Sequence, residues 1–260
     1  MSGIYIHIPF CKQACHYCDF HFSTNLKKKD EMVLALAKEI EMRKSEFQDE
    51  IVETIYFGGG TPSILQIADL KFLIDAVYKN YKVVENPEIT VEANPDDLTE
   101  NRIIELSNNK VNRLSIGIQS FFEDDLQLMN RAHNVEEAKK CLEIATHYFD
   151  NISIDLIYGV PEMSNEKWLQ NIETALSFGI PHISSYALTV EPKTALHSFI
   201  QKGIIPQPDD EVAQEHFQIL VDKLSENGFI HYELSNFGKE NYLYKNNSSY
   251  WLGKKYIGIG

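Results

Sequence analysis

Apolar residues fall into two kinds of segment that alternate along the chain. Short runs rich in Ile, Val, Tyr and Phe predict buried strands at 4–8, 54–57, 89–92, 113–118, 152–157 and 182–188. Longer segments with apolar residues at helical spacing predict helices at about 30–47, 66–79, 99–108, 134–148, 165–178 and 209–226. Because each strand is followed by a helix and the strands are almost continuously apolar, we expect an α/β fold with a parallel sheet covered by helices.

The ends of several predicted elements carry recognisable signals. Asn134 with Glu137 three residues later resembles a capping box. Gly179 and Gly228 follow two predicted helices, at a position where a left-handed residue is favoured. A further strand is expected at 230–234. The final residues, YIGIG, are strand-like with no helix after them, so the chain looks cut off. We therefore divide it into a barrel domain at 1–235 and the start of an incomplete C-terminal domain at 236–260.

Unusual residues gather just after the predicted strands. The periodicity fits an open doubly wound sheet or a closed or partly closed barrel, and in either case ligands bind at the carboxyl ends of the strands. This edge of the sheet would carry three cysteines after the first strand and then, strand by strand, residues 58–61, 94–95, 119–120 and 158–159. We expect the functional site there.

Composition and charge limit the class of protein. The chain has 260 residues, of which 43% are hydrophobic and 24% charged. No apolar run approaches the roughly 18 residues that cross a bilayer, and no secretion signal is evident. We expect a cytoplasmic protein whose thiols stay reduced, with membrane association only through a partner. The net charge of −14 argues against nucleic acid as a partner, and the basic run at 27–29 is interpreted as a solvated approach to a helix.

Three cysteines lie within eight residues of one predicted loop. Cys11, Cys15 and Cys18 are spaced so that all three thiolates can point at one centre. A structural zinc site needs four ligands, and His16 or His21 could supply the fourth. A [4Fe–4S] cluster held by three thiolates keeps one iron open for a ligand. Zinc and an iron–sulfur cluster both remain possible from the residues alone.

The remaining cysteine and the aromatic residues near the loop have simpler interpretations. Cys141 shares a helical face with two alanines, and we interpret it as a buried core residue. Tyr17, Phe20 and Phe22 follow the thiols and would form a shell of low dielectric that restricts water.

The spacing C-x3-C-x2-C at the end of a first strand resembles the signature of the radical S-adenosylmethionine (SAM) superfamily. The resemblance implies a partial (β/α)6 barrel, here with a truncated C-terminal extension, and a [4Fe–4S] cluster held by Cys11, Cys15 and Cys18. It also implies that the amino and carboxylate groups of SAM occupy the open iron. An electron from the cluster would then cleave SAM to a 5′-deoxyadenosyl radical.

The same resemblance assigns SAM contacts to residues of the other loops. Its cofactor-binding residues would be Tyr5, Tyr17, Gly59, Gly60, Thr61, Glu92, Gln119, Arg131, Asp155 and Ala187. Tyr5 and Tyr17 would flank the cluster, and Ala187 would line the adenine. Two alternatives stay open: a tight turn that explains the glycines, and an internal ion pair between Arg131 and Asp155.

Longer stretches narrow the resemblance within the superfamily. The segments YIHIPFC, CHYCDF, YFGGGTPS, VEANPDDLT, NRLSIGIQSF, SIDLIYGVP, SSYALTVEPKT and HYELSNF resemble the group of oxygen-independent coproporphyrinogen III oxidases and HemW-type haem chaperones. The resemblance covers essentially the whole chain. Oxidases tend to carry another cysteine where this chain reads Cys18-Asp19-Phe20, so the chaperone type is favoured.

The chaperone resemblance implies specific ligands and partners. They are haem or a porphyrin as cargo, a recipient haem enzyme, and an electron donor such as a ferredoxin or flavodoxin. The oxidase is the alternative function, and a non-catalytic iron–sulfur or zinc module is a second one. Whether the protein is an enzyme stays open.

One departure from the chaperone pattern concerns the haem ligand. HemW-type sequences usually read H-N-x-x-Y-W where this chain reads NNSSYW, so Asn246 replaces the expected histidine. Asn is a poor iron ligand beside imidazole. His133, His231 and Met129 are alternative ligands by residue type only.

Overall fold

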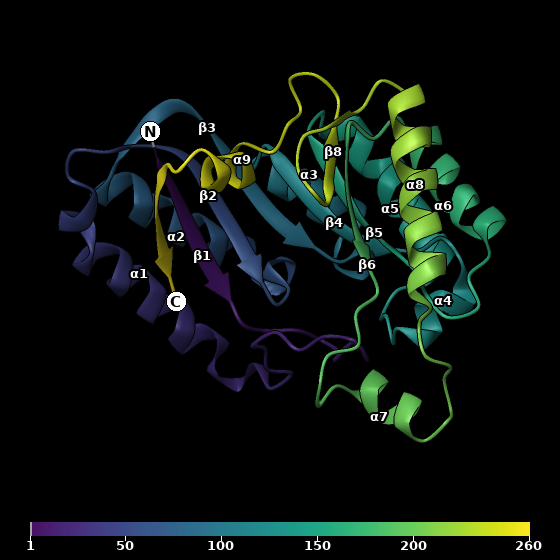
Figure 1. The fold of residues 1–260 in the computed structure, drawn as a ribbon. Coiled ribbons are helices and arrows are strands. Elements are labelled where there is room, and N and C mark those ends of the chain that lie inside the picture. Colours follow the sequence, from purple (N-terminus) through teal and green to yellow (C-terminus); the bar gives the residue numbers. More distant parts are fainter. Residues whose placement is uncertain (1) are drawn as a thin grey trace.

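The computed structural model describes residues 2–260 and places nine strands in one sheet, in the order β7-β8-β6-β5-β4-β3-β2-β1-β9 (Figure 1). The strands are β1 (Ser2–Ile8), β2 (Ile51–Gly59), β3 (Lys82–Ala93), β4 (Arg113–Gln119), β5 (Ile152–Tyr158), β6 (His182–Ala187), β7 (Ile230–His231), β8 (Asn236–Gly238) and β9 (Lys255–Ile259). Strands β1 to β6 are parallel neighbours in chain order.

Helices connect the parallel strands and cover one side of the sheet. The α-helices are α1 (Lys29–Met42), α2 (Ile67–Asn80), α3 (Glu100–Ser107), α4 (Glu123–Leu128), α5 (Val135–Tyr148), α6 (Asn165–Ser177), α7 (Ala195–Gln201), α8 (Asp210–Glu226) and α9 (Lys245–Trp251). Four short 3-10 helices are η1 (Leu26–Lys28), η2 (Lys44–Phe47), η3 (Pro62–Ile64) and η4 (Pro95–Asp97). Among the residues described, no helix is long and apolar enough to cross a membrane.

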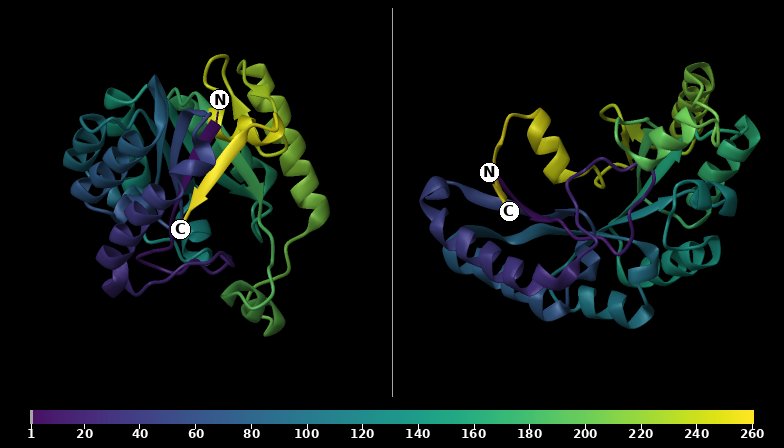
Figure 2. Two further views of the ribbon diagram at one scale, coloured as in Figure 1. Left: turned by 90° about the vertical axis from the view of Figure 1, so that its left-hand side faces the viewer. Right: turned by 90° about the horizontal axis from the view of Figure 1, so that it is seen from below.

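The sheet curves but does not close. Figure 2 shows α1, α2, α3 and α5 along its convex outer side, while α9 lies on the concave side. β9 is added parallel to β1 at one edge, and β8 pairs antiparallel with β6 near the other. The two edge strands of the sheet are therefore β7 and β9, as expected of a partial (β/α)6 barrel.

Alternation along the strands separates an apolar layer from a polar interior. On β1, Ile4, Ile6 and Ile8 are buried beneath the helices, while Tyr5 and His7 alternate with them. Side chains at successive positions of a strand point to opposite faces. The outer face of the sheet therefore forms the hydrophobic core, and the inner face is free to carry polar groups.

The predicted strands and helices of the six βα rounds are confirmed. The capping box is also present, because Asn134 Oδ1 accepts from Glu137 N and Glu137 Oε2 accepts from Asn134 N, both at 2.9 Å. Gly179 and Gly228 have φ of +70° and +77° after their helices, in the left-handed region that glycine adopts readily.

The C-terminal part differs from the expectation. The strand predicted at 230–234 is only the two-residue β7, since the chain turns back to form β8 against β6. The short helices α4, α7 and α9 were not predicted, because a helix of six or seven residues shows too little periodicity. Residues 236–260 join the same sheet at both ends, and the domain boundary at 235 stays a prediction.

Candidate functional site

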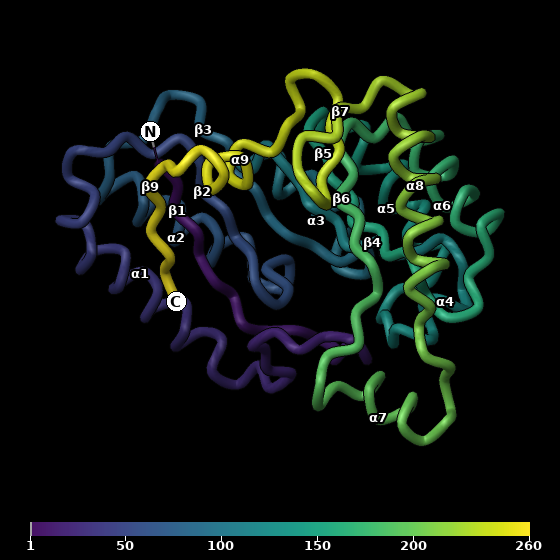
Figure 3. The backbone as a smooth tube through the Cα atoms, in the orientation of Figure 1, coloured from purple at the N-terminus to yellow at the C-terminus, as the bar shows by residue number. Residues whose placement is uncertain are grey.

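The cysteine loop follows β1 and crosses the mouth of the barrel (Figure 3). At its start, Cys11 N donates to Ser23 O at 3.1 Å and Ser23 N donates to Pro9 O at 2.8 Å. In its middle, His16 N donates to Met129 O at 3.0 Å. Backbone hydrogen bonds therefore fix the loop both to itself and to the turn that follows α4.

The three cysteines of this loop are free and half-buried. Burial raises the pKa of Cys11 and of Cys18, and the charges of the neighbouring thiols raise both further. Burial therefore favours the neutral thiols of Cys11 and Cys18, and a bound metal would replace their protons. Within the described part of the chain, no three Cys, His, Asp or Glu side chains converge on a single ion position. The structure thus places the thiols in one loop without a preformed site for one ion.

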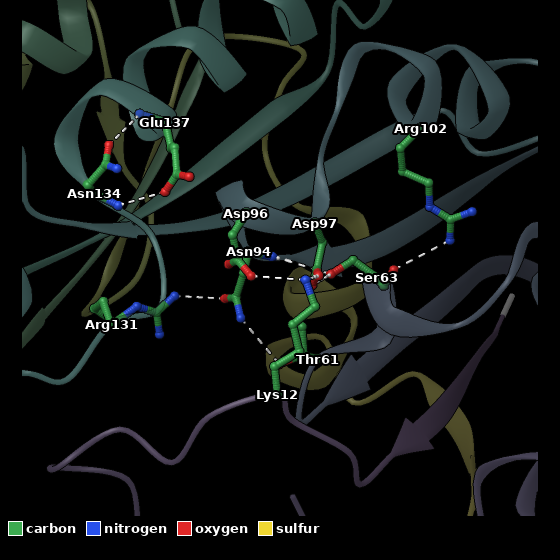
Figure 4. Close-up of polar contacts among 10 residues, drawn as sticks. All are labelled: Lys12, Thr61, Ser63, Asn94, Asp96, Asp97, Arg102, Arg131, Asn134 and Glu137. Atoms are coloured by element: carbon green, nitrogen blue, oxygen red, sulfur yellow. Dashed lines mark hydrogen bonds and ion pairs between the residues drawn. The ribbon is translucent and has the colours of Figure 1, made fainter.

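Arg131 is the cation of the site, and it contacts the cysteine loop directly. Its Nη1 lies 3.3 Å from Cys15 Sγ and 3.4 Å from Tyr17 Oη. Its Nη2 donates to Asn94 Oδ1 at 2.7 Å (Figure 4). The same nitrogen also donates to Gly117 O at 2.8 Å. Arg131 Nε is buried and has no hydrogen-bond partner among the described residues. A buried donor without a partner is a candidate contact for a ligand.

Asp155 lies in the interior without contacting Arg131. No ion pair joins the two within the described residues, so the alternative of an internal pair is not the observed arrangement. Burial raises the pKa of Asp155 to about 6, although Arg113 and Arg131 act in the opposite direction. Asp155 is therefore an acid of the barrel interior whose charge would be better balanced by a cationic ligand.

Glu92 is the last but one residue of β3, and both of its carboxylate oxygens accept hydrogen bonds. Tyr56 Oη donates to one oxygen at 2.5 Å, and Gly59 N donates to the other at 3.0 Å. Burial raises the pKa of Glu92 to about 7, and nearby Asp155 raises it further. Two carboxyl groups with raised pKa thus share the interior at the carboxyl end of the sheet, which is typical of a functional site.

The glycine-rich segment after β2 packs against the cysteine loop. Gly60 N donates to Ile8 O at 2.9 Å, and Thr61 N donates to Phe10 O at 2.7 Å. A Cβ atom on Gly60 would lie 2.6 Å from Phe10 O, which no side chain can tolerate. Gly59 has φ +114°, a conformation that L-residues rarely adopt. Close loop packing therefore requires more than the single glycine of a tight turn.

Gln119 is held in a strained conformation at the end of β4. It has φ +68°, and the pairing of β4 with β5 shifts register between Ile116 and Gln119. A Cβ atom on Gly117 would lie 2.9 Å from Gln119 Nε2 and 3.1 Å from Arg131 Nη2. Gly117 therefore leaves the space that both side chains occupy, and strain of this kind is often found at functional sites.

Two of the residues predicted to flank the cluster and the adenine, Tyr5 and Ala187, lie on β1 and β6. Tyr5 stacks on Tyr56 with ring centroids 5.8 Å apart, and its hydroxyl lies 3.2 Å from His7 Nδ1. Ala187 is the last residue of β6, in register with Tyr158 of β5. Among the predicted residues, Arg131 contacts both Cys15 and Tyr17. Ala187 lies on β6, the last of the six parallel strands.

Sequence reasoning missed a buried cation deeper in the barrel. Arg113 is almost completely buried, and its guanidinium lies 4.1 Å from the centre of the Tyr244 ring. All three guanidinium nitrogens are without a hydrogen-bond partner among the described residues. An arginine at the first position of an otherwise apolar strand was the signal that could have found it. Tyr56 was missed as well, and Asn94 was placed at this edge of the sheet without its role as the acceptor of Arg131 Nη2.

The haem ligands suggested by residue type are engaged elsewhere. His133 is buried with Nε2 3.1 Å from Ile118 O, and burial lowers its pKa to about 4. Met129 is completely buried, and His231 stacks on Phe237 with centroids 4.2 Å apart. His133 and Met129 therefore have packing roles, and His231 is an exposed residue stacked on a neighbouring ring.

Two further residues from the sequence analysis are occupied by protein contacts. His16, a possible zinc ligand, has Nδ1 2.8 Å from Leu128 O. Asn246 is buried on the inner face of the sheet, where its Oδ1 accepts from Thr54 Oγ1 at 3.0 Å. The helix that carries Asn246 therefore packs on the concave side of the sheet, against β1 and β2.

The match to known families agrees with the cysteine loop and the partial barrel. The sequence model described as "Radical SAM superfamily" matches residues 5–175, well over half of the chain. The chain belongs to the radical SAM superfamily. Within it, the chain groups with proteins of the HemW type.

Curated relatives match the chain from end to end. A protein of Bacillus subtilis named "Heme chaperone HemW" is 38% identical over 100% of this chain and 69% of its own length. A protein of the same name in Escherichia coli is 36% identical over 99% of this chain and 68% of its own length. A mitochondrial protein of Danio rerio, named for its radical S-adenosyl methionine domain, is 33% identical over 100% of this chain and 59% of its own length. These relatives are longer than the chain described here.

A solved structure has the same fold. The coproporphyrinogen III oxidase HemN of Escherichia coli, described as a radical SAM enzyme, superposes with a TM-score of 0.85 at 24% identity. The match covers 100% of this chain and 63% of that protein. At this identity the likeness establishes the partial barrel, with its sheet and helices in the predicted order.

Proposed function

We propose that this chain is the radical SAM part of a cytoplasmic haem chaperone, which binds haem and delivers it to a haem-dependent enzyme. The observation that carries the proposal is the likeness, over 99% to 100% of this chain and 68% to 69% of the relatives' own length, to proteins named "Heme chaperone HemW" in Bacillus subtilis, Lactococcus lactis and Escherichia coli, at 34% to 38% identity. The sequence Cys18-Asp19-Phe20 supports the chaperone type over the oxidase type.

The proposal assigns the three loop cysteines to a [4Fe–4S] cluster. Cys11, Cys15 and Cys18 are free, half-buried and on one loop, and Arg131 places a positive charge 3.3 Å from Cys15 Sγ. A cation near a thiolate favours its charged form, which is the form that binds iron. When bound, the cluster would supply one electron to SAM at its open iron.

The proposal places SAM at the carboxyl ends of β1 to β6. Its binding residues would be Tyr5, Tyr17, Gly59, Gly60, Thr61, Glu92, Gln119, Arg131, Asp155 and Ala187. The buried Arg131 Nε is free to donate to the carboxylate of SAM, and Glu92 and Asp155 supply acceptors for its amino group and sugar.

The alternative function is that of an oxygen-independent coproporphyrinogen III oxidase. It is supported by the TM-score of 0.85 against the Escherichia coli oxidase. Both functions need the same cluster and SAM contacts, so the site residues above do not separate them. The cargo separates them: a chaperone releases haem unchanged, whereas an oxidase converts a porphyrinogen.

The test is a haem titration of the anaerobically reconstituted protein, followed by mixing with an apo-haemoprotein. We expect a saturable Soret shift and transfer of haem to the acceptor. A protein that shows no saturable shift, but forms vinyl-bearing product from coproporphyrinogen III with SAM and a reductant, would be the oxidase. Zinc without labile sulfide after anaerobic purification would support a non-catalytic metal module.

A further inference from the structure

Three tyrosine rings form a chain of contacts on the inner face of the sheet. Tyr5 of β1 and Tyr56 of β2 are paired in the register of the two strands, and their ring planes differ by only 17°. The ring of Tyr244, the residue before α9, has its centroid 5.4 Å from that of Tyr56. We name the rings of Tyr5, Tyr56 and Tyr244 the aromatic cluster. It joins the first two strands to the segment between β8 and α9.

A buried cation completes the packing of the aromatic cluster. The guanidinium of Arg113 lies 4.1 Å from the centre of the Tyr244 ring, and a cation over an aromatic face is attracted to it. Arg113 is 1% exposed and Tyr56 is 6% exposed. Because Tyr56 contacts the rings of both Tyr5 and Tyr244, its own ring has little freedom to move. The direction of the Tyr56 hydroxyl is therefore fixed by packing.

The fixed hydroxyl of Tyr56 donates to Glu92. The hydrogen bond reaches Glu92 Oε1 at 2.5 Å, while Gly59 N donates to Oε2 at 3.0 Å. Gly58 leaves the space in which the two side chains meet, because a Cβ atom there would lie 2.7 Å from Tyr56 Cε1 and 3.0 Å from Glu92 Oε1. Both carboxylate oxygens are thus oriented by groups of β2.

Glu92 keeps acceptor capacity for a ligand. It is half-buried, whereas Tyr56 is almost completely buried, so a ligand would meet the carboxylate rather than the tyrosine. A carboxylate offers about four lone-pair positions, and one hydrogen bond on each oxygen leaves further positions free. A primary ammonium group, with three N–H donors and one positive charge, fits an ionised carboxylate that is held in this way.

Other charged and titratable groups surround Glu92. Burial raises its pKa to about 7, and Asp155 on β5 acts in the same direction. The hydrogen bond from Tyr56 is the largest effect that lowers this pKa, ahead of Gly59 N and of Arg113 on β4. Three further tyrosines interact with the charge of Glu92, from β1, β6 and the segment before α9: Tyr5, Tyr186 and Tyr244. Tyr56 is therefore the group that most favours the ionised carboxylate.

We propose that Tyr56 is a positioning residue, which the aromatic cluster holds in place so that Glu92 stays an ionised, oriented acceptor for a ligand's primary ammonium group. This inference rests on the proposed function, because the ammonium group would be the amino group of SAM. Tyr56 does not touch the ligand in this arrangement and acts only through Glu92. No bond is formed or broken in the step.

The test compares two tyrosine-to-phenylalanine variants of the anaerobically reconstituted protein. Tyr56→Phe removes the hydrogen bond to Glu92 and keeps the ring. Tyr81→Phe is the matched control, because Tyr81 is also buried, contacts an aromatic ring and donates its hydroxyl to Ile40 O at 3.0 Å, outside the aromatic cluster. SAM is the probe. Its dissociation constant is measured by isothermal titration calorimetry without a reductant.

We expect Tyr56→Phe to weaken SAM binding about tenfold at pH 7, since a hydrogen bond to a charged group is lost. The ratio of the variant and native dissociation constants should shrink as pH rises to about 8.5, because Glu92 then ionises without help from Tyr56. Tyr81→Phe should bind SAM as the native protein does. Native affinity in Tyr56→Phe, or a loss that is the same at every pH, would overturn the inference.

A second measurement needs neither cluster nor SAM. In urea unfolding of the metal-free protein, a folded-state pKa near 7 for Glu92 makes the free energy of unfolding fall until about pH 7. Tyr56→Phe raises that pKa further, so the fall should continue to higher pH, whereas Tyr81→Phe should keep the native pH profile. Tyr56→Phe/Glu92→Gln should have the profile of Glu92→Gln alone, because Tyr56 acts through Glu92.

The two measurements separate this inference from the proposed function. If the native protein assembles no cluster or binds no SAM, but the unfolding profile of Tyr56→Phe extends to higher pH, the proposed cofactor is wrong and the coupling of Tyr56 to Glu92 stands. A native unfolding profile in Tyr56→Phe would overturn the inference even in a protein that binds SAM.

Discussion

The Arg131 guanidinium lies 3.3 Å from the sulfur of Cys15, although 116 positions of sequence separate the two residues. The contact joins the cysteine loop after β1 to the turn after α4, so both segments contribute to the same site. Since Arg131 also donates to Asn94 and to Gly117, the thiol faces a cation that three parts of the chain hold in place.

Removing one loop cysteine should have a different effect from removing the core cysteine. Cys15→Ala should abolish cluster assembly, because two thiolates are too few to hold the iron. Cys141→Ala should leave the cluster intact, since burial raises the pKa of Cys141 to about 12 and keeps it an uncharged packing residue. Iron and labile sulfide analysis after reconstitution measures both. Equal metal content in the two variants would contradict the assignment.

The raised pKa of Glu92 predicts a pH dependence of stability. A glutamate ordinarily titrates near 4.5, and Glu92 titrates near 7 in the folded protein, so between these values the folded state holds a proton that the unfolded state lacks. The free energy of unfolding should therefore fall as pH rises from 4.5 to 7, by about 2 kcal/mol from this group. Glu92→Gln should remove this part of the slope in urea unfolding of the metal-free protein. Parallel pH profiles for the two proteins would show that Glu92 is not buried as described.

Gly60→Ala should disrupt the packing between the glycine segment and the cysteine loop. The added Cβ would lie 2.6 Å from Phe10 O and 2.8 Å from Phe10 N, both backbone atoms that cannot move alone. We expect a loss of about 1–3 kcal/mol in unfolding free energy and reduced cluster loading. Gly258→Ala is the matched control, because a Cβ there meets nothing within 4 Å. A cost no greater than that of the control would refute the close packing.

Asn246→His should not create a haem ligand, although it introduces the histidine that the resemblance to HemW-type sequences leads us to expect at this position. The side chain is buried, its Oδ1 accepts from Thr54 Oγ1, and even a Cβ atom added to Gly3 would lie only 3.0 Å from this oxygen, so little space surrounds it. The larger imidazole should cost about 1–3 kcal/mol in urea unfolding, and the Soret titration should be no tighter than in the native protein. Asn101→His is the control, because Asn101 is exposed on α3. It should change neither the free energy of unfolding nor the Soret titration. Tighter haem binding by Asn246→His would identify this helix as the haem site after all.

The βα rounds were predictable because each strand is apolar and each helix is long enough to show its period. The capping box at Asn134 and the left-handed Gly228 were readable locally, since both depend on neighbours in the sequence. The strand β8 was not readable and the strand expected at 230–234 was too long, because β8 pairs with β6, some fifty residues away, and β7 pairs only with β8.

The candidate site was predictable in its residues and not in its contacts. The cysteine spacing and the resemblance named Arg131 and Glu92, but the sequence gives no distance between Arg131 and Cys15. The hydrogen bond from Tyr56 to Glu92 depends on the register of β2 and β3, and the unpartnered Arg113 depends on which face of β4 it occupies. These relationships are tertiary, so local patterns do not encode them.

The most direct measurement is the electron paramagnetic resonance spectrum of the anaerobically reconstituted and reduced protein, recorded with and without SAM. The proposal predicts the signal of a reduced [4Fe–4S] cluster whose g-values shift when SAM occupies the open iron. The shift should be lost or weakened in Glu92→Gln, which is expected to bind SAM poorly. A cluster signal unchanged by SAM, or a protein that assembles no cluster, would contradict the central claim that three cysteines leave one iron free for a ligand.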